Sequence, residues 1–166
     1  MHESSSCFSK EGEGDEEMKF GKLRTLRGQV EVTGAVARKN IIVSDGLVNL
    51  GLKIISFQLW DSITPNGTGN RFHTGILSYD TISSGTNMNA GDNRQFAWNQ
   101  SVVRGATGNI LQPHTIIDPD HIVNRDLFLT MTNSTPATYN YLIEAQVVEL
   151  SDDEAIITII KETSQQ

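Results

Sequence analysis

Apolar and polar residues alternate along several short segments of this chain, and this period of two is the feature that most constrains its fold. Residues i, i+2 and i+4 share one face of a β-strand, whereas one face of a helix repeats about every 3.6 residues. In "TYNYLIEAQVVEL" the residues on one such face are Tyr139, Tyr141, Ile143, Ala145 and Val147. The segment therefore predicts a strand with one buried face.

Six other segments have strand-like patterns: "GQVEVTG", "RKNIIVS", "GLKIISFQLWDS", "RFHTGILSY", "NRQFAWNQSVV" and "DLFLTMTN". Turn signals separate them, such as Asp45-Gly46 and the segment "TPNGTGN". The Gly-, Asn- and Pro-rich segments around 80–93 and 104–120 are expected to be loops, and no helical crossover joins the strands. The pattern predicts an all-β fold, an antiparallel β-sandwich or jelly-roll-like arrangement.

The alternation also predicts which side chains form the core. It places Val30 and Val32 on one face, and it places Phe96, Trp98 and Val102 on one face of their strand. The predicted core is Ile55, Phe57, Leu59, Phe96, Trp98, Leu127, Leu129, Ile143 and Val147.

The C-terminal segment "SDDEAIITIIKE" has two possible structures. Ser151 followed by Glu154 has the spacing of a capping box, and acids suit the first turn of a helix, which favours a helix over 152–163. The β-branched residues that follow favour a final strand instead, with "SDDE" as a hairpin loop. On a helix, Ala155, Ile156, Ile157, Ile159 and Ile160 span roughly 200°, more than one sheet needs to cover. Either a partner covers the remainder, or Ile157 lies at the margin of the core.

The length of 166 residues predicts one domain, residues 20–166, preceded by an acidic tail at residues 1–19 that has too few apolar residues to fold. Met18 is an alternative start, so the tail is either a leader without function or an acidic arm. Residues 20–39 form a basic N-terminal arm, with Lys22, Arg24, Arg27, Arg38 and Lys39 against Glu31 alone. This arm is either a contact for an acidic surface or phosphate backbone, or a solvated edge, which we favour.

Composition and motifs exclude several classes of function. The formal net charge of -7 disfavours specific binding to nucleic acid, and no apolar run is long enough to span a membrane. Cys7 is the only cysteine, which excludes an intrachain disulfide. Asp118, Asp120 and His121 are too few ligands for calcium and are better explained as a turn at Pro119. No catalytic motif is present, so we expect a protein that is not an enzyme and needs no metal or cofactor.

The segments "AGDNRQFAWNQ" and "YNYLIEAQVVELSDDEAIITIIKE" resemble parts of small virion structural proteins of bacteriophages. The resemblance covers roughly the last 140 residues. It implies a capsid, decoration or other particle-associated subunit that acts by self-assembly, made in the host cytoplasm and located in the virion. The implied partners are copies of the same chain or other virion proteins, with no membrane and no specific nucleic acid.

Two segments are the candidate assembly interface: the C-terminal element at 151–163 and the basic arm. The residues are Ile156, Ile157, Ile159, Ile160, Lys22, Arg24 and Arg27. The alternative function is a carbohydrate- or ligand-binding β-sandwich module, for which Trp60, Trp98, Tyr139 and Tyr141 would form the aromatic platform. Because these four aromatics lie within alternating strands, core packing is the favoured explanation for them.

Overall fold

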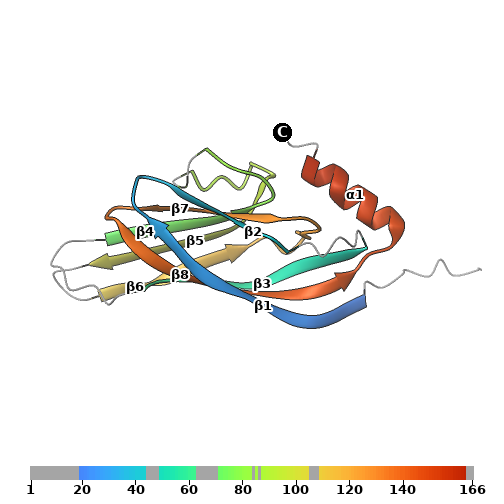
Figure 1. Ribbon diagram of the computed structural model, residues 1–166, viewed down its shortest axis with the longest axis horizontal. Helices are drawn as coiled ribbons and strands as arrows, with labels where there is room; N and C mark the ends of the chain where they lie inside the picture. The colour runs from blue at the N-terminus through green and yellow to red at the C-terminus, as the bar shows by residue number, and fades with distance from the viewer. Residues whose placement is uncertain are drawn as a thin grey trace, which may run out of the picture.

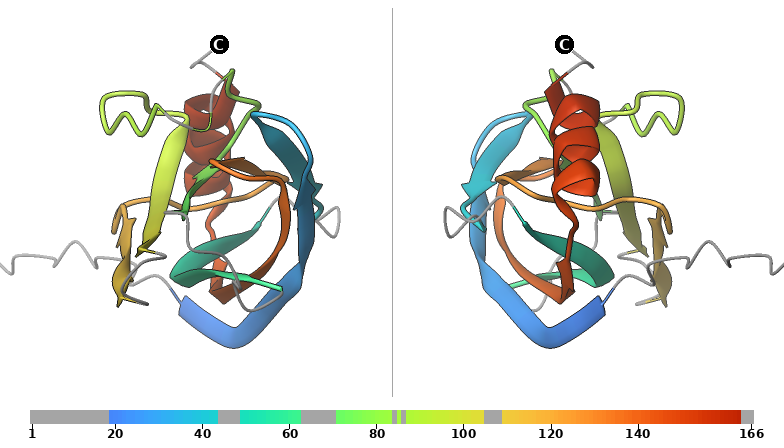
Figure 2. Two further views of the ribbon diagram at one scale, coloured as in Figure 1. Left: turned by 90° about the vertical axis from the view of Figure 1, so that its left-hand side faces the viewer. Right: turned by 90° about the vertical axis from the view of Figure 1, so that its right-hand side faces the viewer.

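The computed structural model describes residues 19–43, 49–62, 71–83, 85, 87–104 and 109–163. Within these residues the chain forms eight antiparallel strands in two sheets that pack face to face, followed by one helix (Figure 1; Figure 2). The predicted β-sandwich architecture is therefore confirmed. The predicted acidic tail, the turn at Asp45-Gly46 and the loop "TPNGTGN" lie outside the described residues, apart from Lys19.

The smaller sheet has three strands in the order β1-β8-β3. Strand β1 (Lys19–Val32) contains most of the predicted basic arm, and it pairs along its length with β8 (Ala137–Glu149). On its other side β8 pairs with β3 (Leu50–Asp61). The basic arm is therefore an edge strand of the sandwich, held by backbone pairing.

The larger sheet has five strands in the order β2-β7-β4-β5-β6. They are β2 (Ala37–Ile41), β7 (Leu127–Asn133), β4 (Arg71–Ser78), β5 (Gln95–Arg104) and β6 (Asn109–Ile117). Strand β6 corrects the expected loop at 104–120. It contains Pro113, which weakened its strand signal, and a proline is tolerated there because β6 is an edge strand that pairs on one side with β5.

The core between the sheets contains most of the residues that the alternation predicted. Six of the predicted set are buried: Phe57, Leu59, Phe96, Leu127, Leu129 and Ile143. Val30 and Val32 are buried as expected, and Val147 is partly buried and packs against the same cluster. Tyr139, Tyr141 and Ala145 complete the inner face of β8.

The prediction for Ile55 is wrong because β3 contains a β-bulge. Ile54 pairs with Ala145 and Ser56 with the next partner, Glu144, which leaves Ile55 as an extra residue. The bulge reverses the alternation, so Ile54 is 3% exposed and Ile55 is 50% exposed. Ile54 takes the core position that the sequence pattern assigned to Ile55.

The prediction that Phe96, Trp98 and Val102 share one face is also wrong, for a similar reason. Leu77 pairs with Ala97 and Ser78 with Gln95, so Phe96 is the extra residue of a second bulge. Phe96 and Ala97 both enter the core, whereas Trp98 is half-buried and its indole N–H donates to Gln95 Oε1 at 2.8 Å. Trp98 and Val102 therefore face away from the core.

The C-terminal segment forms helix α1 (Asp152–Thr163), and the capping box at its start is present in full. The Ser151 hydroxyl accepts a hydrogen bond from the Glu154 N–H at 3.3 Å, and the Ser151 N–H donates to the Glu154 carboxylate at 2.9 Å. These bonds satisfy two backbone donors that a helix start leaves free. The helical alternative is confirmed, and the hairpin alternative is wrong.

Candidate functional site

Helix α1 is anchored to the sandwich at its first turns and presents an apolar face to solvent. Among residues 152–160, whose side chains the structure describes, Ala155 alone is buried, against Val148, Leu150 and Ile122. Ile156, Ile157 and Ile160 are each more than half exposed, and Ile159 is partly buried. Because a contiguous exposed apolar face marks an interaction site, α1 is the first part of the candidate interface.

The first half of β1 is the second part, and it combines positive charge with exposed apolar side chains. Lys22 and Arg24 in this half are exposed, and so is Arg27 just beyond it. Phe20 and Leu23, which the alternation did not predict as interface residues, are each more than half exposed. The pattern missed them because a β-bulge between Phe20 and Leu23 breaks the alternation.

These two surfaces lie at the same end of the molecule. Lys19, at the start of β1, pairs with Glu149, three residues before the helix begins. The start of β1 and helix α1 both lie at the right of Figure 1, and both face the viewer in the right-hand view of Figure 2. The structure thus brings Lys22, Arg24 and the isoleucines to one end of the sandwich, whereas Arg27, which pairs with Leu142, lies near the middle of β1.

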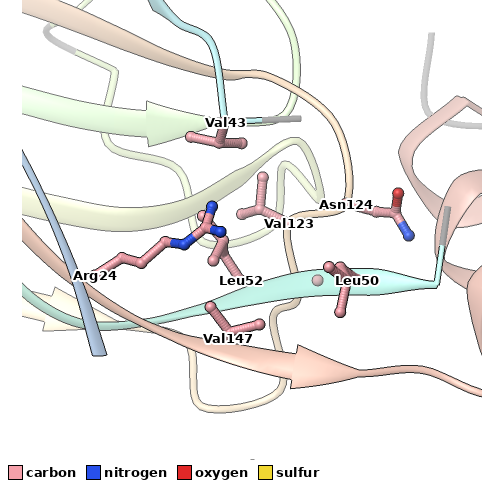
Figure 3. A pocket seen from close by; sticks show the side chains of 8 residues that line it. Arg24, Val43, Leu50, Leu52, Val123, Asn124 and Val147 are labelled. Atoms are coloured by element: carbon pink, nitrogen blue, oxygen red, sulfur yellow. The ribbon is translucent and has the colours of Figure 1, made fainter. Parts of the chain in front are cut away.

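A small pocket opens at this same end (Figure 3), lined by Arg24, Val43, Leu50, Gly51, Leu52, Val123, Asn124 and Val147. The Arg24 side chain extends from β1 toward Leu52. The volume of about 10 Å³ is enough for one water molecule. Pockets for small-molecule substrates enclose about 300–1,000 Å³, so this one cannot hold a substrate.

The residues considered for a metal site have structural roles instead. Asp118 Oδ1 accepts a hydrogen bond from the Asp120 N–H at 2.9 Å, which closes the turn at Pro119. His121 is buried and stacks on Phe96, with ring centroids 4.9 Å apart. Its Nε2 accepts from the Ile54 N–H at 2.8 Å and its Nδ1 bonds to the Asp118 carbonyl, so both ring nitrogens are occupied. Nowhere in the described chain do three or more His, Cys, Asp or Glu residues gather to bind a metal ion.

A buried polar cluster joins the two sheets near the ends of β3 and β7. His73 Nδ1 lies 3.8 Å from Asp61 Oδ1, and the imidazole packs on Tyr139 at 4.8 Å between ring centroids. Asn133 Nδ2 donates to the Tyr139 hydroxyl at 3.3 Å. Burial lowers the pKa of His73, and the charge of Asp61 offsets part of that shift; burial raises the pKa of Tyr139. Because His73 is enclosed in the core, this cluster acts as a structural contact between the sheets.

The outer face of the smaller sheet is open and bears an aromatic side chain among amides. Trp60, which the sequence analysis favoured as a core residue, is 45% exposed. It pairs directly with Asn140, which pairs on its other side with Gln29. Gln29 Nε2 donates to Asn140 Oδ1 at 2.9 Å. The other aromatics proposed for a platform do not join it, because Tyr139 and Tyr141 are buried and Trp98 lies on the other sheet.

The segment between β4 and β5 lies against part of the outer face of the larger sheet. Arg38 Nε donates to the Ile82 carbonyl at 2.8 Å, and Thr74 Oγ1 donates to the Gly85 carbonyl at 2.7 Å. Because Gly75 faces Leu59 and Phe57 of the opposite sheet, Thr74 points outward and holds this segment against the face. Phe72 on β4 and Ile116 on β6 remain exposed, so the larger sheet too has apolar side chains open to solvent, in addition to the smaller sheet and the end with α1.

The described residues include no helix with the length and apolar character that a membrane crossing requires. Comparison of the chain with protein-family models, with curated proteins and with solved structures finds no match, so its function is inferred from its own surfaces.

Proposed function

We propose that this protein is a non-enzymatic structural subunit of a particle, as in a bacteriophage virion, and that it acts by assembling with copies of itself or with other particle proteins. The observation that supports this most directly is the exposure of Ile156, Ile157 and Ile160 on α1. An apolar helix face of this kind is expensive to leave in water and is typical of an interaction surface.

The free energy gained by burying this apolar face determines how strong a contact it can make. Fully burying one isoleucine side chain contributes about 1.5–3 kcal/mol, so covering three that are half-exposed contributes about 2–4 kcal/mol. Association costs at least about 4 kcal/mol in lost translational and rotational freedom. The isoleucines alone therefore support a weak contact, and stable assembly needs either further contacts or many copies held together.

Sedimentation velocity over a concentration series tests the proposal. We expect the wild-type protein to form species larger than the monomer, and Ile157→Asp to shift them toward monomer because a charge would be desolvated in the contact. Ile55→Asp is the matched control: Ile55 is 50% exposed and Ile157 is 53% exposed, but Ile55 lies on β3. Equal effects of the two substitutions, or a wild-type protein that stays monomeric at every concentration, would contradict the proposal.

Location in a virion is tested separately. Particles purified from the native source by density gradient should contain this protein at a fixed copy ratio to the major particle protein, measured by quantitative mass spectrometry. Recovery of the protein only outside particles would contradict its location in a virion. The proposal of self-assembly would then stand without that location.

A neutral saccharide-binding module is the second candidate, favoured by Trp60. An exposed indole can stack on the apolar face of a sugar ring, while the amides of Gln58 and Asn140 offer donors and acceptors for hydroxyls. Oligosaccharide titration followed by tryptophan fluorescence tests it, with Trp60→Ala expected to abolish the change and Trp98→Phe expected to retain it. Absence of any saccharide-dependent change in the wild-type protein would remove this candidate.

A further inference from the structure

We propose that the apolar face of α1 is covered by a second copy of this chain, and that the contact is reciprocal: α1 of each copy packs on the first half of β1 of the other. This inference rests on the proposed function and adds the identity of the partner and of the surface that receives the helix.

Strand β1 offers an apolar surface on a single face. Phe20 pairs with Val148 and Leu23 with Gln146 on β8. Directly paired residues point to the same side of a sheet, and residues 146 and 148 are two apart on one strand, so Phe20 and Leu23 point to the same side. The bulge between them places two exposed apolar side chains on one face, where strict alternation would separate them.

The charges around the two apolar surfaces are complementary. Residues 20–30 include Lys22, Arg24 and Arg27 and no acidic residue. The first turn of α1 consists of Asp152, Asp153 and Glu154. Arg27 pairs with Leu142 and points to the same side as Leu23, Lys22 is the exposed neighbour of Leu23 in the bulge, and Arg24 pairs with Ala145 and points to the core side. A second copy therefore supplies an acidic surface for Lys22 and Arg27, with isoleucines beside the acids and Phe20 and Leu23 beside these two cations.

Helix geometry places these groups together on α1. Asp153, Ile156, Ile157 and Ile160 are related by i, i+3, i+4 and i+7, the spacing of one helix face. An approach of this face to β1 therefore brings the Asp153 carboxylate and the isoleucines to the strand at the same time.

The area and the symmetry of the contact favour a reciprocal dimer. Stable interfaces bury about 1,200–2,000 Å² in total, more than one face of a twelve-residue helix against half a strand provides. Because α1 and the start of β1 lie at the same end of the molecule, a twofold axis at that end makes the contact twice (Figure 1). Reciprocity doubles both the buried area and the number of ion pairs.

Charge reversal tests this arrangement in the full-length chain. Lys22→Glu and Asp153→Lys each place like charges at both contacts of a reciprocal pair, and exposed pairs are individually weak, so we expect the dimer dissociation constant to rise about tenfold at low salt for each variant. In an equimolar mixture of the two variants both contacts are again between opposite charges. The mixture should therefore associate like the wild-type protein.

The control variant is Glu31→Lys, which changes the net charge as Asp153→Lys does, from -7 to -5, but lies near the far end of β1. Reduced net charge by itself would strengthen association, so weakening by Asp153→Lys and not by Glu31→Lys marks a local contact. Circular dichroism of each variant confirms that α1 and the sheets are retained.

The outcomes separate this inference from the proposed function. If Lys22→Glu associates like the wild-type protein, or if the mixture stays as weak as its components, β1 does not receive the helix and the inference is overturned. The assembly proposal would stand in that case, provided that Ile157→Asp still dissociates the wild-type oligomer. A wild-type protein that is monomeric throughout overturns both.

Discussion

The imidazole of His121 accepts a hydrogen bond from the backbone N–H of Ile54 at 2.8 Å, and this contact closes the open edge of β3. Two backbone bonds between Leu52 and Val123, at 2.7 and 2.9 Å, continue the same closure. Since a carbonyl only accepts and an N–H only donates, the imidazole is neutral, with its proton on Nδ1 toward the Asp118 carbonyl. The segment 121–123 thereby satisfies the edge beside the bulge at Ile55.

We predict that the protein loses stability as the pH falls below about 6.5. Burial lowers the pKa of His121; Asp118 opposes this shift and the charge of Lys53 adds to it. Burial also lowers the pKa of His73, and the charge of Asp61 opposes that shift. In the window below 6.5 the unfolded chain binds protons that the folded chain excludes, so the free energy of unfolding falls with pH. Urea denaturation at pH 7.5, 6.5 and 5.5 measures this. A flat profile over that range contradicts it.

Replacing His121 with Phe should cost about 1–3 kcal/mol, because the Ile54 N–H loses its acceptor while the stack on Phe96 is kept. The dependence of stability on pH should also become shallower in His121→Phe. His114→Phe is the control, since His114 is exposed on β6 and its replacement should leave the free energy of unfolding nearly unchanged. Equal effects at the two positions would show that His121 has no special role.

The bulge in β3 predicts opposite sensitivity at two neighbouring isoleucines. Ile54→Ala should lower the free energy of unfolding by about 2–5 kcal/mol, because it leaves a cavity in the core. Ile55→Ala should change it by less than about 1 kcal/mol, since that side chain is half-exposed. Chemical denaturation of both variants gives the comparison, and a larger loss at Ile55 would mean that the bulge is misplaced.

Gly75 is required by close packing between the sheets. A Cβ at this position would lie 2.2 Å from Leu59 Cδ1 and 3.3 Å from Phe57 Cζ, so Gly75→Ala should destabilise by about 1–3 kcal/mol through overpacking. At Gly34 a Cβ would meet nothing within 4 Å, which makes Gly34→Ala the control. Thermal melts should show a lower Tm for Gly75→Ala only.

The capping box links the helix to assembly. Ser151→Ala removes the acceptor for the Glu154 N–H and should destabilise the start of α1 by about 1 kcal/mol. We expect weaker self-association, measured by sedimentation, with little change in the urea midpoint of the sandwich. Ser151→Thr, which keeps the hydroxyl, should restore association.

A variant that begins at Met18 should melt at the same temperature as the full chain. Residues 1–17 contain six acidic residues and few apolar ones, so they have little surface with which to stabilise the sandwich. Differential scanning calorimetry of the two proteins compares them directly. A clear drop in Tm without residues 1–17 would show that this segment packs on the domain.

Local chemistry predicted most of the strands and favoured the helix. The period of two in "TYNYLIEAQVVEL" assigned Tyr139, Tyr141 and Ile143 to the core, because alternation across a sheet is a property of the backbone itself. The spacing of Ser151 and Glu154 outweighed five β-branched residues, because both capping bonds form within one turn.

Tertiary structure decided the features that depend on contacts between distant segments. The bulges that exchange Ile54 for Ile55 and turn Trp98 away from the core are fixed by pairing with β8 and β4, which are separate segments of the chain. Strand β6, with its proline, forms because β5 offers an edge. A sequence pattern shows which side chains alternate, whereas register, bulges and exposure depend on the segments that each face contacts. The sequence was therefore enough to identify the isoleucines of α1. Only the fold placed Phe20 and Leu23 at the same end of the molecule as these isoleucines.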